Sequence, residues 1–239
     1  MVIKGNKTII DCKNVSKQFG YFFALKNLTF QVKSDTIFGI AGANGAGKTT
    51  LIKILSGLLK PTFGTIFLNG MNYEDNSIII RQNIGIITDQ SFLFEELTIF
   101  ENLKYYANLH LNFDKGKIIS EIDKYCKKFN LTDWIDEPVR ILSHGMKQKV
   151  NLIRVLIHQP SILFLDEPFS GLDYKATIML IDFFKELRKN KNISIILTTH
   201  KLEIYPQICD DMIILKKGKI NKILTREDFN ENEIIKSYF

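Results

Sequence analysis

The sequence predicts an α/β fold with a mainly parallel sheet that helices cover on both faces. Short, continuously apolar runs at 37–41, 162–165 and 193–197 predict strands that are buried on both sides. Between them, apolar residues recur at helical spacing over 146–158 and 175–187. Buried strands that alternate with helices are typical of a parallel sheet, because the chain must cross over between neighbouring parallel strands.

Length and composition allow a sizeable core. The chain has 239 residues, which fits one large or two small domains, and 45% of them are hydrophobic. The net charge is +6, from 32 basic and 26 acidic residues. Because the lysines are scattered, we interpret them as solvated surface; a patch for nucleic acid or an anionic membrane is the alternative.

The three cysteines, Cys12, Cys126 and Cys209, are isolated from one another. An odd number without metal-ligand spacing indicates free thiols in a reducing compartment. Residues 1–8 lack the apolar segment of a signal peptide, and no apolar run approaches the ~18 residues that span a bilayer. We therefore expect any membrane association to depend on a partner.

The N-terminal part of the chain predicts antiparallel strands around the first buried strand. The segment 28–32 alternates apolar and polar residues, and Gly20 marks a turn before it. A helix is expected after the first buried strand, ending at Lys60-Pro61. The strands expected in this part are 8–12, 15–19, 28–32, 64–70 and 84–88.

Strand signals become few between 97 and 142. Helical stretches around 100–111 and 118–129 predict a mostly helical insertion. Beyond it the α/β pattern resumes, and a hairpin is expected around Lys217-Gly218-Lys219. The polar tail from Arg226 predicts a terminal helix.

A glycine-rich stretch links the strand 37–41 to the helix that follows. It fits the phosphate-binding pattern G-x-x-x-x-G-K-[ST] at every fixed position, in the required context. Glycines let the backbone fold around a phosphate, and the N–H groups of a helix N-terminus favour an anion. Lys48 is expected to reach the β- and γ-phosphates, and the Thr49 hydroxyl to bind Mg²⁺. The stretch is Gly42-Ala43-Asn44-Gly45-Ala46-Gly47-Lys48-Thr49-Thr50, and the residues expected to contact nucleotide are Asn44, Gly45, Ala46, Gly47, Lys48, Thr49 and Thr50.

An acidic pair, Asp166-Glu167, directly follows the buried strand 162–165. A carboxylate at the C-terminal end of a parallel strand faces the ligand crevice. Asp166 is expected to hold Mg²⁺ through water, and Glu167 to polarise an attacking water. The alternative is that the acidic pair only caps a helix. Ser143 has the same alternative, as the N-cap of the helix 146–158.

Together these stretches resemble the ATP-binding-cassette (ABC) ATPases over about residues 8–220. The signature, rather than the phosphate loop, separates this family from other phosphate-loop enzymes. Five motifs follow one another in the family's order: the phosphate loop, the signature Leu142-Ser143-His144-Gly145-Met146, the acidic pair, the loop Ser170-Gly171-Leu172-Asp173, and His200 after two threonines.

The resemblance implies a single ABC ATPase domain over residues 1–239, built on a P-loop NTPase (RecA-like) core with a mainly parallel sheet. The implied parts are a catalytic core at 1–96 and 143–225 that includes an antiparallel β subdomain, a helical subdomain at 97–142, and a C-terminal tail at 226–239.

The resemblance also implies contacts with ATP beyond the phosphate loop. Phe19 matches the aromatic residue that stacks on adenine; the alternative is a phenylalanine buried in the sheet. Ser143 and Gly145 would contact the γ-phosphate of an ATP that a second ABC ATPase subunit holds, in a homodimer or a heterodimer.

The remaining implied roles concern the reaction and its coupling. Asp173 would help to couple the two nucleotide sites of the dimer. His200 would contact the γ-phosphate and the attacking water, with a structural role as the alternative. Lys48, Glu167 and His200 are therefore the expected catalytic residues, and Thr49 and Asp166 are expected at Mg²⁺.

Two positions depart from the family's usual pattern. His144 stands where glycine is common, and its continuation resembles cassettes of ABC-2-type antibiotic and lantibiotic exporters: Gly145-Met146-Lys147-Gln148-Lys149. Where most members place a glutamine that touches Mg²⁺, this chain has Asp89, whose carboxylate is an expected metal ligand. A register shift of one residue would make Gln90 the ligand instead.

The resemblance implies the ATP-binding and ATP-hydrolysing subunit of an ABC transporter. ATP and Mg²⁺ would close a cassette dimer, and hydrolysis would reopen it. An integral membrane permease would hold the chain at the cytoplasmic, inner face of the cell membrane. Phe92, Leu93 and Phe94 are candidate contacts with that permease; core packing is the alternative.

We expect the transporter to export a peptide antibiotic, a drug or a similar substrate. The signature variant, the carboxylate at Asp89 and the lack of a C-terminal regulatory domain all favour export. The alternatives are an ABC ATPase that acts on nucleic acid or the ribosome, and a regulatory module that binds ATP without useful hydrolysis. ABC ATPases that act on nucleic acid or the ribosome carry long coiled coils or two cassettes, and this sequence shows neither. The presence of Glu167 and His200 argues against a regulatory module without useful hydrolysis.

Overall fold

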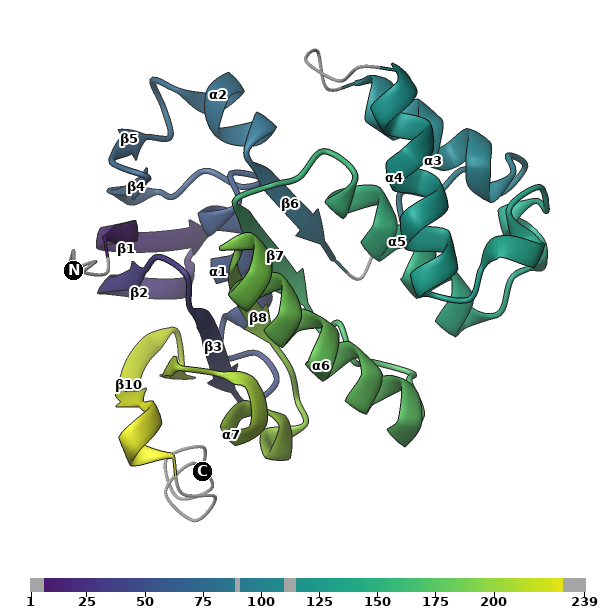
Figure 1. Ribbon diagram of the computed structural model, residues 1–239. Helices are drawn as coiled ribbons and strands as arrows, with labels where there is room; N and C mark the ends of the chain where they lie inside the picture. The colour runs from purple at the N-terminus through teal and green to yellow at the C-terminus, as the bar shows by residue number, and fades with distance from the viewer. Residues whose placement is uncertain (1–6, 89–90, 110–114, 230–239) are drawn as a thin grey trace, which may run out of the picture. The chain divides into compact units, whose positions relative to one another are not determined.

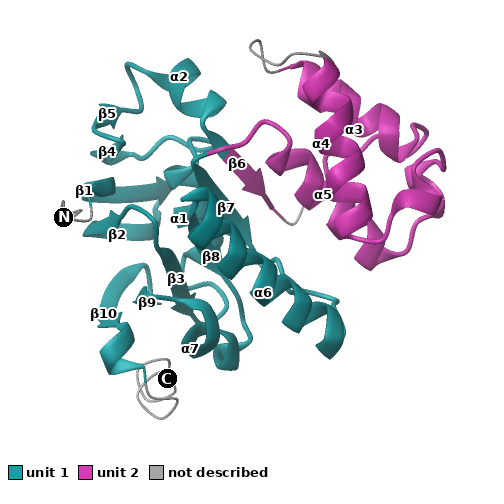
Figure 2. Ribbon diagram, viewed as in Figure 1, with its two compact units in different colours: residues 1–84, 161–239 teal, residues 85–160 magenta. Residues whose placement is uncertain are grey.

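The computed structural model describes residues 7–88, 91–109 and 115–229, which belong to two compact units (Figure 2). The first unit comprises residues 1–84 and 161–239, and the second comprises residues 85–160. Within the described ranges, no helix is long and apolar enough to cross a membrane.

The first unit contains a four-stranded antiparallel sheet in the order β2-β1-β4-β5 (Figure 1). Its strands are β1 (Thr8–Phe19), β2 (Phe22–Lys33), β4 (Phe63–Leu68) and β5 (Met71–Asn72).

One continuous strand, β1, replaces the two short strands expected at 8–12 and 15–19. The ladder is irregular between Cys12 and Val15, and Asn14 adopts a positive φ of 53° there. A bulge therefore takes up the polar residues that interrupt the apolar pattern, and pairing continues beyond them. Gly20 lies at the turn to β2, as predicted.

A second sheet carries the buried strands. Within the first unit its order is β10-β9-β3-β8-β7, with β3, β8, β7 and β9 parallel and β10 antiparallel to β9. Every residue of β3, β7 and β8 is buried, which confirms the three apolar runs as core strands. The strands are β3 (Ile37–Gly42), β7 (Ile162–Asp166), β8 (Ser194–Thr198), β9 (Asp211–Lys216) and β10 (Lys219–Thr225).

The helices of the first unit are α1 (Lys48–Leu55), α2 (Ser77–Gln82), α6 (Tyr174–Lys191) and α7 (Tyr205–Ile208). Both α1 and α6 pack against strands of the second sheet. The predicted end of the first helix, at 60, is wrong, because Gly57 with a φ of 70° follows the last turn of α1. A Cβ at Gly57 would lie 1.9 Å from the Tyr73 ring, so only glycine fits there.

The predicted C-terminal helix is confirmed only as a single 3-10 turn, Arg226–Asp228, which Thr225 caps. The rest of the tail, 230–239, lies outside the described residues.

The second unit is mainly helical. It contains α3 (Ile99–Asn108), α4 (Lys115–Lys128) and α5 (His144–Leu156), together with β6 (Ile84–Ile87), which begins at the last residue of the first unit. Because α5 packs against α3 and α4, it belongs to this unit. The sequence predicts a helical subdomain at 97–142, whereas the second unit of the structure comprises residues 85–160.

Asn102 of α3 is completely buried, and its side chain ties the preceding loop to the helix. Its Oδ1 accepts a hydrogen bond from the Phe94 N–H (2.8 Å). Its Nδ2 lies within hydrogen-bond distance of the carbonyls of Phe94 (3.0 Å), Leu97 (3.2 Å) and Thr98 (2.9 Å). One amide thus satisfies several backbone groups of the segment 94–98.

The variant Asn102→Ala tests this anchor. Alanine removes the acceptor of the Phe94 N–H and a donor that three carbonyls share, and it empties a completely buried position, so the free energy of unfolding should fall by about 2 kcal/mol. Urea denaturation measures the loss. Asn108→Ala is the control, because Asn108 is the exposed last residue of the same helix and its loss should stay within about 0.5 kcal/mol. Equal losses for the two variants would show that Asn102 is no special anchor.

Candidate active site

The phosphate loop connects β3 directly to α1. Gly42, Gly45 and Gly47 have φ angles of 150°, 78° and 107°, which favour glycine. At Gly47 a Cβ would lie 2.6 Å from the Leu25 side chain and 2.8 Å from the Ala24 carbonyl. The loop is thus held against β2 at a distance that no side chain allows, while Asn44, Gly45 and Thr49 remain exposed to a ligand.

Lys48, the first residue of α1, is buried and turns back onto the loop. Its Nζ donates to the carbonyls of Gly42 (2.7 Å) and Ala43 (3.2 Å). Burial lowers the pKa of the Lys48 ammonium, while the negative charges of Glu167 and Asp166 act in the opposite direction and raise it. The site therefore presents a desolvated cation, which an anionic ligand stabilises.

Asp166, at the end of β7, is also buried, and its orientation is set by the neighbouring strand. Its Oδ1 accepts a hydrogen bond from the Thr198 hydroxyl (2.6 Å), and Thr198 pairs with Asp166 across the β7–β8 ladder. The Thr198 Oγ1 in turn accepts from the Glu167 N–H (3.0 Å). One threonine on β8 thus positions both members of the acidic pair.

The residues present fit a magnesium ion that is held partly by the phosphates of a bound nucleotide. Asp166 offers a second carboxylate oxygen, and Thr49 offers an exposed hydroxyl. Among residues 7–88, 91–109 and 115–229, no group of three or more His, Cys, Asp or Glu side chains could hold a metal alone. Mg²⁺ bound to nucleotide takes one or two protein ligands and fills its other positions with phosphate and water.

Glu167 has a φ of 53°, in the left-handed region that a residue with a Cβ enters at a cost of about 1–2 kcal/mol. Its Oε2 accepts a hydrogen bond from the His200 backbone N–H (3.1 Å) and lies 2.8 Å from His200 Nδ1. No helix begins at the acidic pair, so the alternative of a helix cap is wrong; Asp173 caps the next helix, α6. Strain of this kind is found where a side chain must be held for function.

Phe19 is the last residue of β1 and is 50% exposed, which excludes the alternative of a phenylalanine buried in the sheet. Lys17 Nζ lies 5.2 Å from the centre of the Phe19 ring. Tyr21 and Phe22 are exposed beside it. The tip of the β1–β2 hairpin thus offers an aromatic surface on which a base could stack.

Two expected nucleotide contacts, Ser143 and Gly145, lie in the second unit. Ser143 is exposed and caps α5, since its hydroxyl accepts from the Met146 N–H (3.3 Å). The signature thus begins a helix, with the N–H groups of its first turn available to an anion. The remaining expected metal ligands, Asp89 and Gln90, lie outside the described residues.

A contact that the sequence did not reveal joins the β9–β10 hairpin to the phosphate loop. The Gly218 N–H donates to the Ala46 carbonyl (3.1 Å), and the Gly218 carbonyl accepts from the Lys26 N–H of β2 (2.7 Å). A Cβ at Gly218, where φ is 75°, would lie 2.6 Å from the Ala24 carbonyl. The predicted hairpin is confirmed, but its position against the loop is a long-range contact without a sequence signal.

The second unit exposes an aromatic patch formed by Phe92, Phe94 and Tyr105, which are 43%, 45% and 46% exposed. The rings of Phe94 and Tyr105 meet edge to face, with centroids 5.1 Å apart. Leu93, between the two phenylalanines, is buried. Core packing therefore accounts for Leu93 alone among the three candidate permease contacts.

Arg154 of α5 supports this patch from below the surface. Its guanidinium lies 5.5 Å from the centre of the Phe92 ring and 4.9 Å from that of Tyr106. Its Nε donates to Asn151 Oδ1 (2.8 Å), and burial lowers the pKa of Arg154 to about 10. The stacked cation fixes the Phe92 ring at the edge of the patch.

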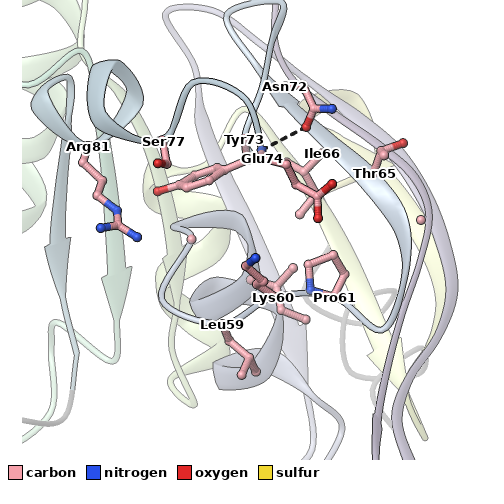
Figure 3. Close-up of a pocket in the computed structure, with 13 residues that line it drawn as sticks. Leu59, Lys60, Pro61, Thr65, Ile66, Asn72, Tyr73, Glu74, Ser77 and Arg81 are labelled. Carbon is pink, nitrogen blue, oxygen red and sulfur yellow. Dashed lines mark hydrogen bonds between the residues drawn. The ribbon is translucent and has the colours of Figure 1, made fainter.

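A pocket of about 150 Å³ lies elsewhere in the first unit, beside the C-terminal end of α1 (Figure 3). Tyr73, Lys60 and Arg81 are among the residues that line it, and none of the lining residues belongs to the phosphate loop or the acidic pair. The Tyr73 hydroxyl donates to the Ser56 carbonyl (2.7 Å). This part of the unit therefore holds α1 in place, separate from the expected chemistry.

Comparison with known proteins places these features in a family. Residues 25–170 match the family described as ABC transporter. The uncharacterised ABC transporter ATP-binding protein YhcH of Bacillus subtilis is 33% identical over 95% of this chain and 73% of its own length. The methionine import ATP-binding protein MetN 1 of Bacillus cereus is 34% identical over 94% of this chain and 67% of its own length.

A solved structure agrees with the chain over nearly its full length. It is the dimeric post-hydrolysis state of the ATP-binding cassette MJ0796, bound to ADP and Pi. It superposes with a TM-score of 0.84 at 25% identity, covering 92% of this chain and all of that one.

The variant Gly218→Ala tests whether the hairpin supports the phosphate loop. The new methyl group would collide with the Ala24 backbone and displace the Ala46 carbonyl, so the Kd for ATP, measured by calorimetry, should rise at least about tenfold. Gly70→Ala is the matched control, because Gly70 has a φ of 77° but no atom within 4 Å of its Cβ position. Equal Kd values for the two variants would contradict the support.

Proposed function

The chain belongs to the ABC transporter family and is an ATPase that uses ATP and Mg²⁺, and we propose that it powers the export of a peptide antibiotic, drug or similar substrate through a separate membrane permease. The observation that carries the proposed hydrolysis of ATP is the Glu167–His200 pair at the end of the buried strands. A general base held by a second group is the arrangement that activates water for attack.

In the proposed reaction each residue of the first unit has one task. Lys48 binds the β- and γ-phosphates, for which it leaves the loop carbonyls that it contacts here. Thr49 and Asp166 hold Mg²⁺, which neutralises phosphate charge when bound. Glu167 orients and deprotonates water, and His200 holds the Glu167 carboxylate in place and contacts the γ-phosphate.

The proposed site is completed by a second cassette. Phe19 stacks on adenine in the same chain, whereas Ser143 and Gly145 reach the γ-phosphate of the nucleotide on the facing chain. The dimeric state of the MJ0796 cassette with ADP and Pi supports this pairing. Asp173, exposed at the start of α6, lies on the segment that would couple the two sites. The partner is an identical chain or a second cassette of the same family.

The proposed contact with the permease is the aromatic patch. Phe92, Phe94 and Tyr105 expose apolar rings on a charged chain, and such clusters mark surfaces for a protein partner. Through this contact a chain without a membrane-spanning helix in its described ranges would act at the inner face of the membrane. Asp89, a few residues before the patch, is the proposed link between the permease and Mg²⁺.

The proposed direction depends on the signature. Relatives of this chain include the methionine import protein MetN 1, so membership of the family is compatible with either direction. The continuation Gly145-Met146-Lys147-Gln148-Lys149 and the carboxylate at Asp89 resemble exporters of antibiotics and lantibiotics. Export is therefore the direction that the chain's own residues favour.

The variant Glu167→Gln tests the reaction and the direction together. The amide accepts no proton from water, so kcat should fall by at least about 100-fold while the Kd for Mg-ATP changes little. Inside-out vesicles that carry the chain and the permease that co-purifies with it should accumulate fluorescent nisin or bacitracin with external ATP, and vesicles with Glu167→Gln should not.

Two results would contradict the proposal. Normal turnover by Glu167→Gln would exclude Glu167 as the base. ATP-dependent uptake into right-side-out vesicles, with none into inside-out vesicles, would show import.

A further inference from the structure

A buried tyrosine hydroxyl lies between β3 and the turn that follows β8. Tyr205, the first residue of α7, has no exposed surface. Its hydroxyl accepts a hydrogen bond from the Thr199 N–H (3.0 Å). It also lies 2.8 Å from two carbonyl oxygens, those of Ile40 and Thr199, to which its one proton can be donated.

The ring of Tyr205 is placed by a close approach to β3. A Cβ at Gly39 would lie 2.7 Å from the Tyr205 ring, so the ring fills the space that glycine leaves open. Ile40, the next residue, lies two positions before Gly42, where the phosphate loop begins. The tyrosine is thus held at the start of the loop by packing and by its hydroxyl.

Thr199 leads from this hydroxyl to the reacting groups. It follows β8 and precedes His200, whose N–H and Nδ1 both meet the Glu167 carboxylate. Its own hydroxyl accepts from the Lys201 N–H (3.1 Å), so the turn is held on both sides. The Tyr205 hydroxyl is therefore connected to His200 through the peptide between Thr199 and His200, and His200 in turn contacts Glu167.

We propose that Tyr205 is a positioning residue that sets the orientation of His200, and through it of Glu167, for the attack of water on ATP. The proposal rests on the roles proposed above for Glu167 and His200. Without the hydroxyl, the buried Thr199 N–H loses its partner, and the Thr199 carbonyl, which belongs to the peptide that carries His200, loses the hydroxyl beside it, so that this peptide is free to turn away. Small errors in the placement of a base are costly to the rate and leave substrate binding intact.

The test is Tyr205→Phe, which keeps the ring beside Gly39 and removes only the hydroxyl. The kcat should fall by about tenfold, while the Kd for Mg-ATP should stay within about twofold of the wild-type value. Tyr73→Phe is the matched control, because it removes a hydroxyl that also bonds a backbone carbonyl in the same unit. That variant should lose comparable thermal stability and keep its kcat.

A double mutant separates positioning from stability. If Tyr205 acts through His200, adding Tyr205→Phe to His200→Ala should lower kcat by less than about twofold further. A full tenfold loss in the double mutant would overturn the proposal, as would an unchanged kcat for Tyr205→Phe alone. If His200→Ala itself keeps full turnover, the proposed role of His200 fails, which is a different result from a silent Tyr205→Phe.

Discussion

A buried cation at the start of a helix is the constraint on which the rest of this structure depends. Lys48 is 8% exposed, and removing an ammonium from water is costly unless charge and hydrogen bonds replace the solvent. In the structure that replacement comes from two loop carbonyls and from the nearby carboxylates of Asp166 and Glu167. The phosphates of ATP would provide a stronger replacement, because charge-assisted hydrogen bonds to an anion exceed those to a neutral carbonyl. The loop is therefore built for an anionic ligand.

The surrounding elements keep that loop and its acidic partners in register. Parallel pairing of β3, β7 and β8 brings their carboxyl ends to one edge, where Thr198 orients the acidic pair. Gly218 holds the outer side of the loop, and Tyr205 joins β3 to the turn that carries His200. Each contact comes from a segment far away in sequence. The groups proposed to react are thus positioned by the sheet and by backbone contacts, which would cost no reorganisation during the reaction.

The core and the phosphate loop could be predicted from sequence because their signals are local. Continuous apolar runs identified β3, β7 and β8, and the spacing of glycines and Lys48 identified the loop. The short elements α2 and β5 have too few residues to show a period, and α1 ends early because Gly57, against which Tyr73 packs, follows its last turn in a left-handed conformation. The exposure of Phe19 and the partners of Tyr205 and Gly218 follow from tertiary packing, which no local pattern contains. The roles expected of Phe19, Ser143, Gly145, Asp173 and His200 come from the resemblance to a family, and the comparisons confirm that the chain belongs to it.

The central claim is that the desolvated ammonium of Lys48 is the group that binds the phosphates of ATP. Calorimetric titration of Lys48→Ala with Mg-ATP tests it most directly. Lys53→Ala is the control, because Lys53 lies in the last turn of the same helix, away from the loop. Loss of the buried cation should weaken ATP binding by at least about 100-fold, or about 2.7 kcal/mol, while Lys53→Ala binds normally. Wild-type affinity in Lys48→Ala would contradict the account.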